Sequence, residues 1–198
     1  MTKEENNKYK QYLRLLISYN DFQQSIEIAD TIIEEEYSKL RSELKGKEGQ
    51  RIRKIWEGLN CSMVIAYCRP FSFNDKKSSN RIPDLPSNIL KCLTEEEREL
   101  HTALINERNT MLAHSDSEAW NMQPTFIQLK KSGRKILYPA SFDTRAPLLE
   151  EVVSKIHVMA SKLREETFRR RMILEKEISH LFPIEEIDEK KLNYKQSG

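Results

Sequence analysis

An arginine and a histidine lie close together in the stretch "ERNTMLAHSDSE", residues 107–118. Arg108 and His114 are separated by five residues, and the polar Asn109 follows the arginine. A histidine has an ordinary pKa of about 6.5, so it can accept or donate a proton at neutral pH. An arginine guanidinium binds phosphate oxygens through a planar set of donors. Together, these residue types can hold a phosphate and move a proton beside it.

Arg108 falls on the apolar side of a predicted helix. Leu104 stands four residues before it and Leu112 four residues after it, so its side chain emerges among aliphatic residues. Burying a guanidinium costs several kcal/mol unless a partner compensates. One interpretation is that Arg108 pairs with Glu97 or another carboxylate, or that its long stem reaches solvent. The other is that it lines a cleft between subunits and binds a phosphate.

The distance between Arg108 and His114 depends on where this helix ends. In a straight helix, His114 would stand about 120° round from Arg108 and roughly 9 Å further along the axis. Arginine side chains on a helix also lean toward its N-terminus, away from His114. The two groups converge if "HSDSE" ends the helix and turns the histidine inward, or if a two-fold axis brings in the motif of a second subunit.

The sequence predicts five helical segments that position this motif, because apolar residues recur at helical spacing along them. They run from about Lys3 to Ser18, from Asp21 to Leu44, from Gln50 to Tyr67, from Thr94 onward, and from about Ala146 to His180. Asn20 is the expected cap of the second helix, and "KGKEG" breaks the chain after it. At the start of the fourth helix, Thr94 is the expected N-cap and Glu97 takes the capping-box position. Residues 71–86 are rich in Pro, Ser and Asn and are expected to form a surface loop.

A short β-hairpin is predicted before the last helix. The stretch "PTFIQLKKSGRKILYPA", residues 124–140, has two β-branched and aliphatic runs around a Ser132-Gly133 turn. A two-stranded ribbon alone is marginally stable, so we expect it to lean on the helices. The last helix is too long to be covered by a domain of this size, so we expect part of it to meet a partner subunit.

These elements predict one mainly all-α domain over residues 1–198. We expect an antiparallel helical bundle with a loop and hairpin insertion at residues 120–145, and a flexible tail at residues 181–198. The 33 Lys and Arg nearly balance the 31 Asp and Glu, so any nucleic-acid contact has to be local.

Cysteine spacing and hydropathy indicate the compartment. The three cysteines form no C-x-x-C pair and no zinc-finger spacing, and nothing resembles a metal triad, so we expect neither metal nor cofactor. The N-terminus is charged from its third residue, and no long apolar run follows. We therefore expect a cytoplasmic protein without a membrane segment.

The stretch "RNTMLAHSD" resembles the signature of the HEPN superfamily, the higher eukaryote and prokaryote nucleotide-binding domains. In that signature an arginine, usually followed by a polar residue, precedes a histidine by four to six intervening positions, and Arg108, Asn109 and His114 fit this pattern. The motif also falls late in a helix that follows two long helices. The "AYCRPFS" end of the third helix and the hairpin look like those of bacterial HEPN proteins of abortive-infection and toxin–antitoxin systems. The motif is seven residues long, so the resemblance rests on the motif and on the order of the helices.

The resemblance implies a metal-independent endoribonuclease that acts as a homodimer in defence or as a toxin. The two motifs would face each other across a cleft at the subunit interface, with RNA as substrate and a protein antitoxin as a possible partner. His114 would act as base or acid, Arg108 would hold the phosphorane oxygens, and Asn109 would contact the phosphate or orient His114. The expected products are a 2′,3′-cyclic phosphate and a 5′-hydroxyl, formed in the presence of EDTA.

Three further residues are weaker candidates for substrate binding. His101 is more readily explained as a core-edge or cleft-lining residue, because the motif does not include it. Glu97 is more often a capping-box carboxylate, and Arg69 is either a loop anchor or a phosphate contact. The arginines of the last helix could follow an RNA backbone, although the glutamates between them favour a solvated face. These arginines are Arg164, Arg169, Arg170 and Arg171.

The alternative from another class is a non-catalytic HEPN scaffold that binds nucleotide, RNA or a nucleotidyltransferase-type partner. A scaffold has no physical need for a desolvated arginine near an ionisable imidazole. The presence of Arg108, Asn109 and His114 together therefore favours the enzyme.

Overall fold

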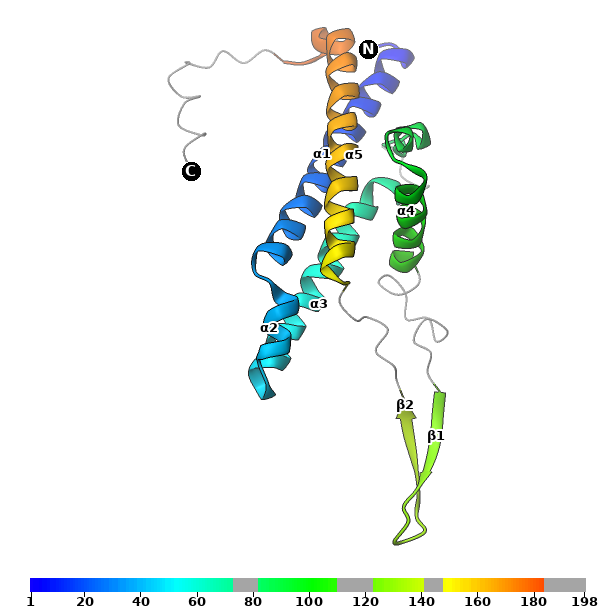
Figure 1. Ribbon diagram of the computed structural model, residues 1–198. Coiled ribbons are helices and arrows are strands. Elements are labelled where there is room, and N and C mark those ends of the chain that lie inside the picture. Colours follow the sequence, from blue (N-terminus) through cyan, green and yellow to red (C-terminus); the bar gives the residue numbers. More distant parts are fainter. Residues whose placement is uncertain (73–81, 110–122, 141–147, 184–198) are drawn as a thin grey trace.

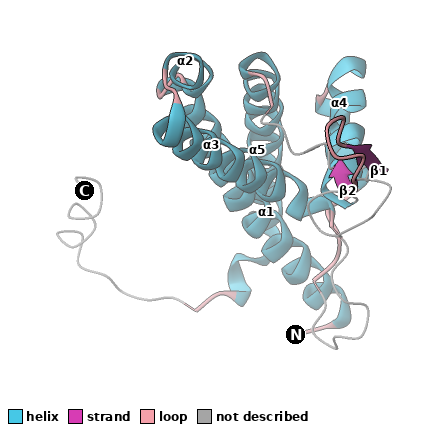
Figure 2. Ribbon diagram, turned by 90° about the horizontal axis from the view of Figure 1, so that it is seen from below, coloured by secondary structure: helices cyan, strands magenta, loops and turns pink. Residues whose placement is uncertain are grey.

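The structure is a computed structural model, and it describes residues 1–72, 82–109, 123–140 and 148–183. These residues form five α-helices and one antiparallel hairpin, which confirms the predicted mainly all-α fold (Figure 1). The helices are α1 (Lys3–Glu34), α2 (Tyr37–Glu43), α3 (Gly46–Cys68), α4 (Glu95–Glu107) and α5 (Glu150–Ile178). Helix α1 packs most extensively against α5 and then against α3. Seen from below, α2 and α4 lie on opposite sides of α5 (Figure 2).

Helix α1 is one element of 32 residues, where the sequence predicts two helices separated near Asn20. An asparagine inside a helix costs only tenths of a kcal/mol relative to alanine, or roughly 0.7 kcal/mol at most. Burial of one large apolar side chain contributes about 1.5–3 kcal/mol. Phe22 and Ile26 are both buried just beyond Asn20, so packing carries the helix through this point. The predicted break was therefore wrong, and the chain turns instead at Glu36, which has a left-handed φ of 47°.

The starts of the later helices agree well with the sequence. In α4, the Thr94 hydroxyl accepts a hydrogen bond from the Glu97 N–H, and the Glu97 carboxylate accepts one from the Thr94 N–H at 2.8 Å. This is the predicted capping box. Helix α3 begins slightly before the predicted Gln50, and α5 begins slightly after the predicted Ala146.

The core lies where α1, α3 and α5 meet. It also includes residues of the short 3-10 helix η2 (Ser87–Cys92), of which Ile89 is fully buried, and Leu104 of α4. None of the described helices has the length and hydropathy needed to span a bilayer. The largest fully buried side chains in the three central helices are Phe22, Met63, Tyr67, Ile156, Met159, Leu163 and Ile178.

A continuous α1 accompanies α5 along most of its length (Figure 1). His157 Nε2 lies 3.1 Å from Asp30 Oδ1 near one end, and Lys8 Nζ lies 3.1 Å from Glu177 Oε2 near the other. Helix α1 thus covers one side of α5, and the expectation that another part of α5 meets a partner subunit stays a prediction. The large apolar side chains that α5 still exposes are Val158, Phe168, Met172 and Ile173.

The beginning of the predicted flexible tail is packed against α1. A 3-10 turn (Ser179–Leu181) follows α5, and the Phe182 ring then lies 5.9 Å from the Tyr9 ring and 5.0 Å from the Tyr12 ring, measured between centroids. The aromatic side chain of Phe182 thus has partners on α1, and the flexibility of residues 181–198 stays a prediction. Residues 184–198 lie outside the described residues.

The predicted hairpin is present, with strands β1 (Gln123–Gln128) and β2 (Lys135–Ala140). Its turn is closed by a 2.9 Å hydrogen bond from the Gly133 N–H to the Leu129 carbonyl. Gly133 has a φ of 66°, a left-handed conformation that residues with a Cβ adopt at a cost. The expectation that the ribbon leans on the helices was wrong: Figure 1 shows it projecting away from them.

Candidate functional site

Two of the three predicted catalytic residues lie at the C-terminal end of α4. Helix α4 ends at Glu107, and the Arg108 N–H still bonds to the carbonyls of the last turn. The Arg108 side chain is half-buried, and its Nη1 donates to Oδ1 of the exposed Asn109 at 2.9 Å. His114 lies outside the described residues, so its distance from Arg108 stays a prediction.

Glu97 is not the partner of Arg108. The two residues are eleven positions apart on one helix, which corresponds to about 16 Å along its axis. Both Glu97 oxygens have other partners, since Oε1 lies 2.6 Å from Lys162 Nζ of α5 and Oε2 accepts from the Thr94 N–H. Burial opposes ionisation of Glu97, but the bonds from Lys162 and the Thr94 backbone outweigh it and lower its pKa. Glu97 thus caps α4 and ties it to α5.

His101 lies in the core beneath the end of α3. Its Nδ1 lies 3.0 Å from the Tyr67 hydroxyl, and its ring packs edge-on against the rings of Tyr67 and Phe71, at centroid distances of 5.8 and 4.5 Å. Burial lowers the pKa of His101 to about 4. The neutral imidazole therefore serves as a packed, hydrogen-bonded core group at neutral pH.

The end of α4 also carries a carboxyl group that the sequence did not single out. Glu107 is half-buried, and burial raises its pKa above the ordinary value. It is close enough to the buried Cys68 of α3 for its charge to affect the pKa of that thiol, as is Arg108. Burial raises the pKa of Cys68 to about 12, so this thiol is not a nucleophile at neutral pH. Glu107, which directly precedes Arg108 in the chain, is thus a further candidate for proton exchange.

Arg69, the residue before Pro70, connects α3 to α1. Its Nη1 donates to Asp21 Oδ1 at 3.0 Å and to Gln24 Oε1 at 2.9 Å. Asp21 is buried, and its desolvation raises its pKa despite the opposing charge of Arg69. These contacts make Arg69 a structural anchor of the α1–α3 packing.

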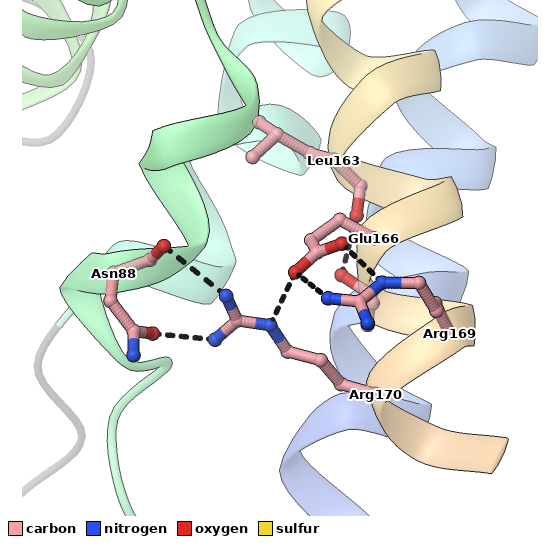
Figure 3. A network of polar contacts seen from close by, with 6 residues as sticks. Asn88, Leu163, Glu166, Arg169 and Arg170 are labelled. Atoms are coloured by element: carbon pink, nitrogen blue, oxygen red, sulfur yellow. Dashed lines mark hydrogen bonds and ion pairs between the residues drawn. The ribbon is translucent and has the colours of Figure 1, made fainter. Parts of the chain in front are cut away.

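The basic run of α5 is engaged in contacts within the subunit (Figure 3). Glu166 accepts hydrogen bonds from Arg169 at 2.8 Å and from Arg170 at 2.7 Å, and these bonds lower its pKa to about 2. Arg170 also bonds to the side chain and the carbonyl of Asn88, which attaches α5 to η2. The guanidinium of Arg171 stacks over the Phe168 ring at 5.0 Å. Packing and ion pairing within the subunit therefore explain the positions of these arginines, and no contact with an RNA backbone is needed.

A buried arginine lies on α1, where the sequence did not indicate one. Arg14 is 4% exposed, its Nε donates to the Pro83 carbonyl at 2.9 Å, and its Nη2 lies 3.8 Å from Asp84 Oδ1. Desolvation lowers its pKa. It lines a cavity of about 250 Å³ between α1, the Pro83–Pro86 segment and α5. The signal in the sequence was a polar track on one face of α1, at i, i+4, i+7 and i+11, formed by Arg14, Ser18, Asp21 and Ser25.

In the described part of the chain, no three His, Cys, Asp or Glu side chains are grouped so that they could hold a metal ion. The chain was compared with models of protein families, with curated proteins and with solved structures, and none of the three comparisons gave a match.

Proposed function

We propose that this chain is a metal-independent endoribonuclease that acts as a homodimer, with Arg108, Asn109 and His114 as its catalytic residues. The observation that supports this function is the environment of Arg108. Its guanidinium is half-exposed at the end of α4, is held by the exposed Asn109, and is not neutralised by Glu97. The resemblance of "RNTMLAHSD" to the HEPN signature suggests the reaction that such an arginine would serve.

The proposed reaction is an internal transfer at phosphorus. His114 removes the proton from a ribose 2′-hydroxyl, and the 2′-oxygen attacks the adjacent phosphorus. The bond from phosphorus to the 5′-oxygen of the next nucleotide breaks. That oxygen takes a proton from the partner subunit's His114. Arg108 holds the phosphorane oxygens as their negative charge grows. The products are a 2′,3′-cyclic phosphate and a 5′-hydroxyl.

The need for two proton-transfer groups is the chemical reason for a dimer in this proposal. One chain supplies one motif histidine, whereas the reaction uses a base and an acid. Glu107 offers a second group in the same subunit, because its raised pKa lets it retain a proton at a higher pH than an ordinary glutamate does. Glu107→Gln separates these possibilities: it leaves cleavage unchanged if the two histidines suffice and slows it if the carboxyl takes part.

The test is cleavage of labelled tRNA and of a structured mRNA by purified protein in EDTA. We expect Arg108→Ala and His114→Ala each to reduce the rate at least about 100-fold, the usual scale for a lost acid–base or charge-stabilising group. The matched control is Arg98→Ala, which removes a half-buried arginine of the same helix that pairs with Glu95. It should cleave like the wild type, with cyclic-phosphate ends.

A folded, dimeric wild type that cuts neither RNA contradicts the proposal, and so does equal loss of activity in Arg98→Ala. In that case the non-catalytic scaffold takes its place. A role as a toxin in the cytoplasm adds a cellular expectation. Expression of the wild type should slow growth, Arg108→Ala should not, and a cognate protein antitoxin should relieve the effect.

A further inference from the structure

All the charged side chains of the β-hairpin are basic. Residues 123–140 contain four basic residues and no acidic one, in a chain whose charges otherwise nearly cancel. The basic residues are all exposed and all lie around the turn: Lys130, Lys131, Arg134 and Lys135. No carboxylate of the hairpin itself neutralises them.

The backbone of the hairpin holds these charges together at one end. The strands pair in register up to Gln128 and Lys135, and the Leu129 N–H donates to the Arg134 carbonyl at 2.9 Å. The Gly133 N–H donates to the Leu129 carbonyl, which closes the turn. The positive groups are therefore grouped on a defined tip, at the end of a ribbon roughly 20 Å long.

The ribbon also exposes large apolar side chains. Phe126 is 68% exposed, and Ile127 and Ile136, which face each other across the strands, are 43% and 44% exposed. Phe126 and Ile127 are adjacent, so they point to opposite faces. Figure 1 shows the hairpin projecting beyond the helices, which do not cover it. A two-stranded ribbon with apolar groups on both faces is stabilised when a ligand covers it.

We propose that this hairpin is an RNA-binding arm that holds single-stranded RNA next to the catalytic motif. The inference rests on the proposed ribonuclease function and deepens it. The basic tip matches the charge of a phosphate backbone, and an exposed aromatic ring stacks on a base of any sequence. β1 begins nine residues after His114, so the base of the hairpin lies within roughly 31 Å of that histidine. One RNA strand can reach both.

The test is RNA binding by protein that carries His114→Ala, which prevents cleavage. A fluorescent single-stranded RNA is titrated at several salt concentrations, and its anisotropy gives the affinity. The hairpin variant changes Lys130, Lys131, Arg134 and Lys135 to Gln. The control variant makes the same change of charge on exposed residues around the start of α3, and changes Lys45, Lys47, Arg51 and Lys54 to Gln.

We expect the hairpin variant to bind more than about 10-fold more weakly than the parent. Its slope of log affinity against log salt should fall by roughly 2–3, because each lost phosphate contact removes about 0.7. The control variant should bind like the parent. Phe126→Ala should weaken binding about 10-fold and leave the salt slope unchanged, since stacking involves no counterion release. Circular dichroism confirms that each variant keeps its helices. If the hairpin variant does not fold, the affinity of Phe126→Ala for RNA tests the inference instead.

Equal binding by the hairpin and control variants overturns the inference, and the cleavage assay in EDTA still decides the proposed function. If the His114→Ala parent binds no RNA, the inference is overturned as well. Whether the proposed function also fails is decided by the separate cleavage assay of the wild type. Equal affinity for poly-glutamate and for RNA overturns the assignment to RNA in favour of an acidic protein partner.

Discussion

Acidification should destabilise the fold through His101. The imidazole is 7% exposed, its Nδ1 lies 3.0 Å from the Tyr67 hydroxyl, and its ring packs edge-on against the Tyr67 and Phe71 rings. Burial lowers the pKa of this histidine to about 4, from an ordinary value of about 6.5 in the unfolded chain. Between these two pH values the unfolded chain binds more protons. The contribution of neutral His101 is therefore fully present above pH ~6.5 and is lost as the pH falls toward 4.

The size of this effect follows from the two pKa values. Between about pH 7 and pH 5, proton linkage at one such site removes about 2 kcal/mol of unfolding free energy. A free energy of this size is a large part of the stability of an ordinary domain. The unfolding free energy should therefore begin to fall near pH ~6.5, which is above the pH range in which exposed carboxylates titrate.

The assay is urea unfolding at several pH values, for the wild type and for His101→Gln. Glutamine does not titrate, and its amide oxygen can accept the hydrogen bond of the Tyr67 hydroxyl. At pH 7 the variant should be less stable by about 1–2 kcal/mol, because the packing of the ring is lost. Between pH 7 and pH 5 it should lose about 2 kcal/mol less than the wild type. Parallel pH profiles for the two proteins would refute the reasoning.

Two further stability predictions concern surface contacts. Glu166→Gln should lower the unfolding free energy at pH 7 by roughly 1–2 kcal/mol, since Arg169 is 62% exposed and solvent screens part of the interaction. The pKa of Glu166 is about 2, below the ordinary 4.5, so its stabilisation is present above pH ~4.5 and is lost toward pH 2. Glu165→Gln is the control, and equal urea midpoints for the two variants would contradict this. Thr94→Ala should cost about 1 kcal/mol by thermal unfolding, because it removes the cap of α4. Thr102→Ala, further along the same helix, should cost clearly less, and a larger loss there would argue against capping.

The elements that the sequence predicted well are those whose signals are local. The capping box at Thr94 and Glu97 uses residues three positions apart, and it fixes the start of α4. The Ser132-Gly133 pair marks the hairpin turn because glycine tolerates a left-handed conformation. Such signals act within one turn of the chain, so a single sequence contains them in full.

The elements that the sequence predicted poorly depend on distant partners. Asn20 resembles a helix cap until the burial of its neighbours against α3 and α5 is known, and packing then overrides the local preference. Arg14 looks like an ordinary charged residue, yet the Pro83 carbonyl makes its burial possible from 69 positions away. At the candidate site, helical spacing predicted that Arg108 belongs to the helix that begins after Thr94, and the structure places it directly after the last residue of α4. The half-burial of Glu107 was not, because it depends on the packing of α4 beside α3.

The pairing of α1 with α5 sets a time order for synthesis. These helices form the largest packing surface of the fold, and 115 residues, 35–149, separate the end of α1 from the start of α5. At about 5–20 residues per second, a ribosome needs roughly 6–23 s to synthesise that stretch. During this interval α3 can cover one side of α1, while the side that will meet α5 stays open to other chains and to chaperones. A ribosome that pauses before α5 would therefore hold a nascent chain with an open apolar face for longer, and a slow stretch of codons after α1 should increase aggregation of the protein.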